Sequence, residues 1–153
     1  MKLLTAIDFS DITPRLLEQT SALAKALSAE VFLIHVAEPN PDHIAYDYDP
    51  ATVYTIDAEE IRKSIAERFH QEHITLQEYS QDMRDQGINC TALMIQGVVV
   101  DLLLKEAERL EVSFIVAGTH GKGLISQLLL GSISEQLIRQ TTIPVHLVPA
   151  KKT

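Results

Sequence analysis

Glycine residues gather between Gly118 and Ser132, a stretch that reads Gly-Thr-His-Gly-Lys-Gly-Leu-Ile-Ser-Gln-Leu-Leu-Leu-Gly-Ser. A short apolar run at 112–117 precedes the stretch, and an amphipathic run that begins at Ile133 follows it. A strand would therefore lead into a glycine-rich loop, and a helix would begin where the loop ends. The free N–H groups of such a loop and the positive end of the helix dipole suit an anion, above all phosphate. We therefore predict that this stretch holds the phosphates of a nucleotide.

Two familiar phosphate-binding motifs do not fit this stretch. A P-loop requires a glycine five residues before its Gly-Lys pair, and for Gly121-Lys122 that position holds Val116. A dinucleotide fingerprint that began at Gly121 would require a third glycine at position 126, which holds Ser126. The spacing that is present is Gly-x-x-Gly, nine intervening residues and then Gly-Ser, formed by Gly118, Gly121, Gly131 and Ser132.

The serine and the glycines of this pattern differ in what they indicate. Ser132 and Glu135, three residues later, form a capping box, so the helix alone accounts for the serine. The helix does not account for Gly118 and Gly121. Their lack of a Cβ lets the backbone come close to an oxyanion, and the set as a whole favours a bound phosphate.

Hydrolysis of a nucleotide requires more than a phosphate cradle. It needs an oriented water and a base beside a metal-bound γ-phosphate. Asp8 and His120 are candidates for orienting that water, but the spacing fixes neither at the required distance. The sequence contains no Gly-x-Ser-x-Gly motif to indicate a nucleophile. We therefore name no catalytic residue and expect at most slow ATP hydrolysis.

The elements around the glycine-rich stretch alternate between strands and helices. Apolar runs predict strands at 2–7, 31–37, 89–95, 112–117 and 143–148. Amphipathic segments with apolar residues three and four apart lie between them and predict helices. This alternation predicts a single-domain α/β fold with a mostly parallel sheet and helices on both faces. Ligands of such sheets bind beyond the carboxyl ends of the strands, where the strand order reverses.

Three of the predicted helices are defined by their inward-facing positions. The first helix is capped by Thr13 and presents Leu16, Thr20, Leu23 and Leu27. The second runs from Asp57 to Gln86, stops at Gly87, and presents Ile61, Ile65, Phe69, His73, Leu76, either Tyr79 or Ser80, and Met83. The third follows Gly97 and presents Val99, Leu102, Leu103, Ala107 and Leu110.

Composition limits the classes of protein to consider. A chain of 153 residues with 46% apolar content predicts one domain over residues 1–153 with a sizeable core. A net charge of −8 argues against a nucleic-acid partner. No apolar segment of signal-peptide or transmembrane length is present, and a single cysteine fits a reducing compartment. We therefore expect a cytoplasmic protein without membrane insertion.

Several other residues have a structural interpretation. His35 lies between apolar neighbours and is interpreted as a buried, hydrogen-bonded histidine. Cys90 enters a strand and is interpreted as a small core residue. His73 is interpreted as partly buried and not as a metal ligand, because no distant cysteine or histidine completes a set with His70. Segment 38–56 is either disordered or a cover over the site.

The glycine spacing, with a strand before it and a helix after it, resembles the ATP-binding branch of the universal stress protein family. Two further segments match the family along the chain: Ala6-Ile7-Asp8-Phe9-Ser10 resembles its first nucleotide loop, and Leu33-Ile34-His35-Val36 resembles its second strand. The final strand is similar at 143–148. The resemblance implies a Rossmann-like, adenine nucleotide alpha hydrolase-like fold with an open five-stranded parallel sheet in the order 3-2-1-4-5. It also implies a stress-response or regulatory protein that binds ATP, ADP or AMP, with Mg²⁺.

The resemblance also implies which positions contact the nucleotide. Ala6, Ile7 and Val36 would line the adenine pocket, and Asp8 would hydrogen-bond to the base or ribose. Three residues would approach the ribose and phosphates: Gly118, His120 and Gly121. Four would contact the phosphates through backbone and hydroxyl groups: Gly131, Ser132, Ile133 and Ser134. The sequence departs from some nucleotide-binding members of the family, which have proline in place of Ala6 and of Val99.

The strand at 143–148 predicts a partner. Pro144 near its start favours an edge strand, and its apolar residues are unsuited to a freely solvated edge. Pairing of this strand with its copy would give a homodimer, which the resemblance also implies. An unknown regulatory protein is a second expected partner. Two alternative functions stay open: a nucleotide-free adaptor of the same fold, and a slow Mg-dependent ATP hydrolase.

Overall fold

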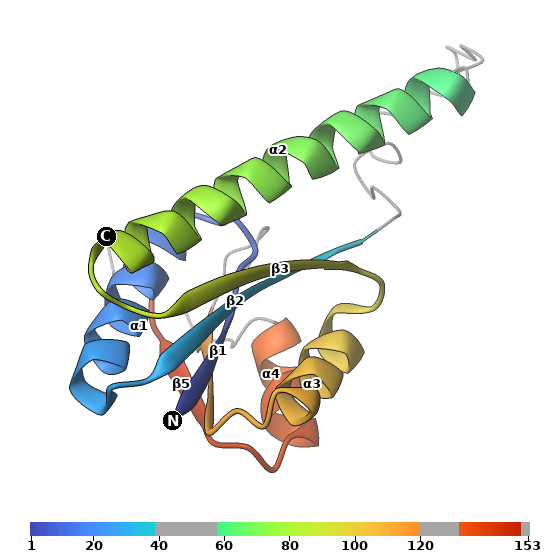
Figure 1. The fold of residues 1–153 in the computed structure, drawn as a ribbon. Helices are drawn as coiled ribbons and strands as arrows, with labels where there is room; N and C mark the ends of the chain where they lie inside the picture. Colours follow the sequence, from blue (N-terminus) through green and yellow to red (C-terminus); the bar gives the residue numbers. More distant parts are fainter. Residues whose placement is uncertain (39–57, 120–131, 151–153) are drawn as a thin grey trace.

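The computed structural model describes residues 1–38, 58–119 and 132–150. Figure 1 shows these residues as a sheet with helices on either side. The elements follow in the order β1 (Lys2–Ala6), α1 (Thr13–Leu27), β2 (Glu30–Ala37), α2 (Ala58–Asp85), β3 (Cys90–Gln96), α3 (Val99–Arg109), β4 (Phe114–Gly118), α4 (Ser132–Gln140) and β5 (Val145–Val148).

The five strands of the described residues form one sheet in the order β3-β2-β1-β4-β5. Every neighbouring pair is parallel. The predicted strand order and the open parallel sheet are therefore confirmed. From β1 the chain moves through β2 to β3 in one direction, and it then returns to the other side of β1 to place β4 and β5. The strand order thus reverses between β1 and β4.

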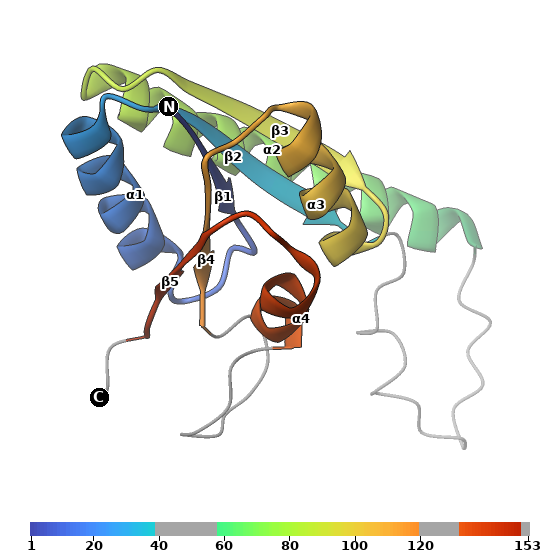
Figure 2. The same ribbon diagram turned by 90° about the horizontal axis from the view of Figure 1, so that it is seen from below.

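Two apolar layers hold the helices against the sheet. One core cluster includes Leu3, Leu16 and Leu76, and so joins β1 to α1 and α2. The other includes Leu4 and Leu103, and so joins β1 to the α3 and α4 side. Leu3 and Leu4 are adjacent in β1 and point to opposite faces, as pleating requires. Figure 2 shows α1 and α2 on one side of the strands, with α3 and α4 on the other.

Strand β2 is the most completely covered strand of the sheet. Seven of its eight residues are buried, and the exception is Glu30 at its start. A strand that carries helices on both faces must be apolar on both faces. His35 is 7% exposed within this strand, and both its ring nitrogens have hydrogen-bonding partners, so its interpretation as a buried, satisfied histidine is confirmed.

Helix α2 is 28 residues long and its first half extends past the sheet in Figure 1. Its inward positions include Leu76, Ser80 and Met83, all nearly inaccessible to solvent. The prediction that His73 lies on the inward stripe is wrong, because His73 is exposed. Glu72 takes the inward position instead, and its carboxylate contacts His35.

Smaller differences concern helix ends and faces. Helix α1 begins at Thr13 with Ile12 as its N-cap, so the predicted cap by the Thr13 hydroxyl is absent. Leu27 is 39% exposed because it lies at the last position of α1, beyond the sheet-facing turns. In α3 the buried positions are Val100, Leu103 and Ala107, so Val100 replaces the predicted Val99. Gly87 has φ +82° and ends α2, as predicted.

Strand β5 lies at an edge of the sheet and is hydrogen-bonded to β4. The backbone carbonyl of Pro144, just before the strand, accepts a bond from Ile115. The edge position predicted for this segment is confirmed, although the strand begins at Val145 and not at position 143. Among the helices of the described residues, none has the length and apolar character needed to cross a bilayer.

Candidate functional site

The candidate site lies where the backbone ladder between β1 and β4 ends. The last paired residues of these strands are Thr5 and Val116. On either side the ladders continue further: Ile7 donates to the Ile34 carbonyl at 2.8 Å, and Thr119 donates to the Val148 carbonyl at 3.0 Å. Beyond the pair Thr5–Val116, the chain after β1 stays hydrogen-bonded to β2, and the chain after β4 stays hydrogen-bonded to β5. This is the carboxyl edge at the reversal of strand order, where sheets of this type bind ligands.

The loop after β1 has a defined conformation. One carboxylate oxygen of Asp8, Oδ1, accepts a bond from the Ser10 N–H at 3.0 Å and another from the Ser10 hydroxyl at 2.6 Å. Such a bond from an aspartate to the backbone two residues on closes a local turn. Phe9, between them, has φ +55°, a left-handed conformation that is unusual for a bulky side chain. Asp8 thus shapes the loop, and only its Oδ2 is uncommitted by these two bonds.

The end of β4 is tied to the first turn of α4. The hydroxyl of Ser134 donates to the Gly118 carbonyl, and the Ser134 side chain is buried at 4% exposure. Its hydroxyl hydrogen is therefore already used within the protein. Toward a phosphate, Ser134 has its backbone N–H in the first turn of α4, where such groups lack helical partners. Ile133 beside it is 37% exposed.

The predicted adenine-pocket residues fall on two faces of the sheet. Val36 is 6% exposed and belongs to the α3 and α4 side, where Ala6 also packs. Ile7 is 3% exposed and its side chain belongs to the α1 and α2 side. The structure therefore brings Ala6 and Val36 together, while Ile7 reaches the site with its backbone.

Other predicted site positions lie outside the described residues or are described only in part. His120, Gly121 and Gly131 are outside the described residues, as is segment 39–57, which contains most of the predicted cover. Ser132 is the first residue of α4, one position inside the helix from the N-cap position that the capping box gives it. Within the described residues, no group of three or more acidic, histidine or cysteine side chains is arranged to hold a metal ion.

Two residues that shape this edge, Phe9 and Glu72, were not predicted as site residues from the sequence. Phe9 packs its ring on His35 with centroids 4.6 Å apart, and it packs on Tyr79 at 6.2 Å. Glu72 reaches His35 from α2. The positive φ of Phe9 cannot be predicted from its residue type. Glu72 is a charged residue on an amphipathic helix, so the sequence pattern places it on the exposed face. The sequence signal for Glu72 is indirect: a polar His35 in an apolar strand needs a hydrogen-bonding partner, and a carboxylate on the next helix, α2, can supply it.

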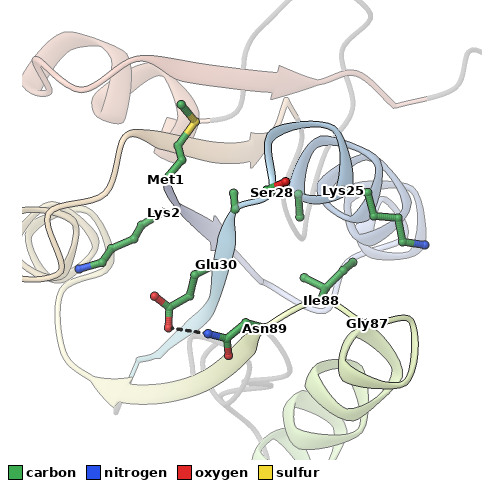
Figure 3. Close-up of a pocket in the computed structure, with 10 residues that line it drawn as sticks. Met1, Lys2, Lys25, Ser28, Glu30, Gly87, Ile88 and Asn89 are labelled. Atoms are coloured by element: carbon green, nitrogen blue, oxygen red, sulfur yellow. Dashed lines mark hydrogen bonds between the residues drawn. The ribbon is translucent and has the colours of Figure 1, made fainter.

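A cavity of about 600 Å³ lies at the opposite, amino end of the sheet (Figure 3). Four of its polar side chains, those of Lys2, Lys25, Glu30 and Asn89, already have partners. Lys2 donates to the Leu110 carbonyl at 2.9 Å, Asn89 to Glu30 at 3.3 Å, and Lys25 to Gln86 at 3.0 Å. No set of unpaired polar groups converges on this cavity, whereas the carboxyl edge has a helix N-terminus beside the diverging strands. The carboxyl edge is therefore the candidate site.

The geometry defines a doubly wound α/β protein with its candidate site between the ends of β1 and β4. The model of the universal stress protein family matches residues 1–149. The chain belongs to the universal stress protein family. It is 23% identical over 162 residues to Universal stress protein MJ0577 of Methanocaldococcus jannaschii, with 99% of this chain and 96% of that protein covered.

Solved structures give the same fold. The structure of MJ0577 aligns with a TM-score of 0.80 and 25% identity, covering 99% of this chain and 97% of that one. A universal stress protein from Archaeoglobus fulgidus in complex with dAMP aligns with a TM-score of 0.63 and 19% identity, covering 96% of each chain. A universal stress protein in complex with cAMP has the same TM-score, 0.63, and 19% identity, covering 97% of this chain and 96% of that one.

Proposed function

We propose that this protein binds an adenine nucleotide, ATP in particular, at the carboxyl ends of β1 and β4, and that it acts as a cytoplasmic regulatory module of the stress response. The observation that carries this proposal is the end of the β1–β4 ladder at Thr5 and Val116, beside the glycine-spaced stretch 118–132. Parallel strands that part at a reversal of strand order leave room for a ligand, and the glycines let backbone N–H groups reach a phosphate.

Two proteins of the same fold support an adenine nucleotide as the ligand class. One was solved with dAMP and another with cAMP. In this chain Ala6 and Val36, which pack on one face, would contact the base, and Asp8 Oδ2 would contact the base or ribose. Gly118, His120, Gly121 and Gly131 would surround the ribose and phosphates, with Ser132, Ile133 and Ser134 at the start of α4. Mg²⁺ would offset the charge of the outer phosphates.

The structure of the loop after β1 bears on hydrolysis. Asp8 Oδ1 accepts two hydrogen bonds from Ser10, and we assign Oδ2 to the base or ribose. A base that activates water must instead have an acceptor within hydrogen-bond reach of the water at the γ-phosphate. We therefore propose binding with at most slow turnover. Rapid release of phosphate, lost in Asp8→Asn, would instead support the alternative of a Mg-dependent ATP hydrolase.

Calorimetry tests binding. Mg-ATP, ADP, AMP and Mg-GTP are titrated into protein that has been freed of carried-over ligand. The proposal expects saturable heat with the adenine nucleotides, weaker binding of GTP, and loss of binding in Gly121→Val, since a branched side chain would block the approach of a phosphate. Asn89→Ala, at the cavity at the other end of the sheet, is the matched control and should bind as the wild type. Absence of heat at millimolar ATP would favour the nucleotide-free adaptor.

The same proposal includes a homodimer formed through the segment at 143–148. Strand β5 has a hydrogen-bonded neighbour on one side, β4, within the described part of the chain. Val145 and Leu147 are half-buried, which leaves apolar surface at this edge. Pairing of two such strands would cover that surface and satisfy the outward backbone groups. The regulatory protein that would read the nucleotide state is the remaining proposed partner.

A further inference from the structure

His35 connects two parts of the molecule that are far apart in sequence. Its Nδ1 lies 2.7 Å from the backbone oxygen of Ile7, in the loop after β1. Its Nε2 lies 3.2 Å from Oε2 of Glu72, on α2. The side chains of His35 and Glu72 are only 9% and 14% exposed, so water competes weakly for both contacts. One imidazole therefore bridges the candidate nucleotide loop and the long helix.

The two partners determine where the protons lie. A backbone carbonyl only accepts hydrogen bonds, so Nδ1 carries a hydrogen and donates it to Ile7. Nε2 faces Oε2 of Glu72 from the other side of the ring, so a hydrogen bond there requires a hydrogen on one of these two atoms. The two contacts of the ring use different nitrogens and can therefore be separated by substitution.

Phe9 gives a second reason to regard His35 as a support for the loop. Its backbone has φ +55°, which costs free energy for any residue with a bulky side chain. Such a conformation persists only where the surroundings hold it. The Phe9 ring lies 4.6 Å, centroid to centroid, from the His35 ring. His35 thus contacts the loop twice, through the Ile7 carbonyl and through the Phe9 ring.

The contact continues along α2 to the end of β2. Arg68 Nε lies 3.9 Å from Oε1 of Glu72, within reach of an ion pair but too far for a hydrogen bond. The same guanidinium donates from its Nη2 to the Glu38 carbonyl at 2.9 Å. Glu72 thus contacts both His35 and Arg68, and Arg68 joins this part of α2 to the end of β2.

We propose that His35 is a positioning residue for the nucleotide site, which holds the loop at Ile7–Ser10 in its binding conformation and couples that loop to α2 through Glu72. This inference rests on the proposed function, because it assigns the loop to nucleotide binding. The affinity for ATP should therefore depend on His35, whose side chain lies on the opposite face of the sheet from Val36. His35 itself would not contact the ligand.

Two substitutions separate the two contacts of His35. Asparagine places its side-chain nitrogen the same number of bonds from Cβ as Nδ1, so His35→Asn keeps a donor for the Ile7 carbonyl and loses the contact with Glu72. Glutamine places its nitrogen where Nε2 lies, so His35→Gln keeps the contact with Glu72 and loses the donor for Ile7. Glu72→Gln keeps a neutral hydrogen bond to His35, since an amide can donate to an unprotonated Nε2.

The experiment combines calorimetry with ATP and amide NMR of the ligand-free proteins. His35→Gln is expected to weaken ATP binding about tenfold or more, since a buried carbonyl loses its donor. His35→Asn should stay within about threefold of the wild type, by retaining that donor. In NMR spectra, the amides at 7–10 should shift in His35→Gln, and those of α2 around Glu72 should shift in His35→Asn.

Each outcome decides the inference. Equal weakening by both histidine variants, or unchanged binding with unmoved loop amides, would overturn it. If circular dichroism shows that neither histidine variant folds, the amide spectra of Glu72→Ala and Glu72→Gln decide instead. Shifts at 7–10 in the alanine variant alone would support the coupling of the loop to α2, and no shift there in either variant would overturn it. If the wild type itself does not bind ATP, the proposed function fails. The positioning role is then judged by whether the loop amides move in His35→Gln and stay in His35→Asn.

Discussion

The hydroxyl of Ser134 donates a hydrogen bond to the carbonyl of Gly118. This bond joins the last residue of β4 to the first turn of α4 across the stretch 119–133. It therefore fixes the separation of the two ends of the glycine-rich segment, independently of the segment itself. A phosphate that contacts both ends would therefore bind to groups whose separation is already set.

Removal of this bond should destabilise the protein and weaken nucleotide binding. Ser134→Ala leaves the Gly118 carbonyl without its side-chain donor, at a cost of about 1–2 kcal/mol in the free energy of unfolding. Urea denaturation measures this loss. Ser64→Ala is the control, since Ser64 is an exposed serine of α2 and its replacement should change the free energy by less than about 0.5 kcal/mol. Equal effects of the two substitutions would contradict the role of the bond.

A buried pair of threonines predicts an asymmetric response to mutation. Thr20 Oγ1 donates to the Leu16 carbonyl at 2.8 Å and lies 3.1 Å from Thr5 Oγ1. Because the Thr20 hydrogen is used, Thr5 must be the donor within the pair. Both side chains are fully buried.

Thr20→Val should therefore cost more than Thr5→Val. In Thr20→Val the Thr5 hydroxyl is buried without an acceptor, which costs about 1–3 kcal/mol, whereas in Thr5→Val the Thr20 donor keeps its bond and the cost is about 1 kcal/mol or less. Thermal or urea unfolding of the two variants measures the difference. A larger loss in Thr5→Val would show that the donor assignment is wrong.

Burial controls the chemistry of Cys90. Desolvation raises the pKa of the Cys90 thiol, partly offset by the nearby Ser80 and Arg84. The thiolate is therefore scarce in the folded protein, and the sulfur is 3.6 Å from the Met83 sulfur inside the core. We expect a thiol reagent to modify the native protein at least about 100-fold more slowly than the denatured protein, since reaction requires opening of the structure.

The raised pKa also gives a pH dependence of stability. The folded state keeps the thiol proton at a pH where the unfolded chain loses it, so the unfolded state binds fewer protons and stability falls with rising pH. The contribution is complete below the ordinary pKa of 9.0 and is lost above it. The free energy of unfolding should therefore fall more steeply above about pH 9 in the wild type than in Cys90→Ala. Equal slopes for the wild type and Cys90→Ala above pH 9 would show that the Cys90 thiol does not cause the pH dependence.

The direction of backbone groups in β5 gives a sharp test of the proposed dimer. The carbonyls of Pro144 and Val148 accept bonds from β4, so the backbone groups of even-numbered residues point to β4 and those of Val145 and Leu147 point outward. Leu147→Pro removes an outward N–H and leaves the bonds to β4 in place. Sedimentation should show a dimer of twice 17.0 kDa for the wild type and a monomer for this variant.

Leu147→Ala is the matched control for this experiment. It loses the same side-chain packing as Leu147→Pro but keeps the backbone N–H, so it should stay dimeric or dissociate only at low concentration. A wild type that sediments at 17.0 kDa at every concentration would exclude the dimer. Identical behaviour of the two variants would exclude backbone pairing as its cause.

The fold was predictable because its strands differ in pattern from its helices. The fully apolar run of β2 is typical of a strand covered on both faces, and Gly87 marked the end of α2 through a conformation that glycine adopts freely. Helix α4 begins at Ser132, within one residue of the start that the capping pattern predicts. These features depend on residues close together in the sequence, so the sequence pattern is enough to predict them.

The parts that could not be predicted depend on contacts between distant segments. Glu72 and His73 are adjacent on α2, and helical spacing allows either to face inward. The choice is made by His35, 37 residues away, which offers a partner to a carboxylate. In the same way, Ile7 follows the last residue of β1, and only the packing of α1 and α2 shows which face its side chain joins.

Binding of an adenine nucleotide where β1 and β4 part can be checked by mapping amide shifts in NMR spectra during a titration with Mg-ATP. Saturable shifts are expected at Ala6–Asp8, at Gly118 and in the first turn of α4, with none around Asn89 and Lys25 at the opposite end of the sheet. Spectra that do not change at millimolar ATP, or shifts confined to that opposite end, would contradict it.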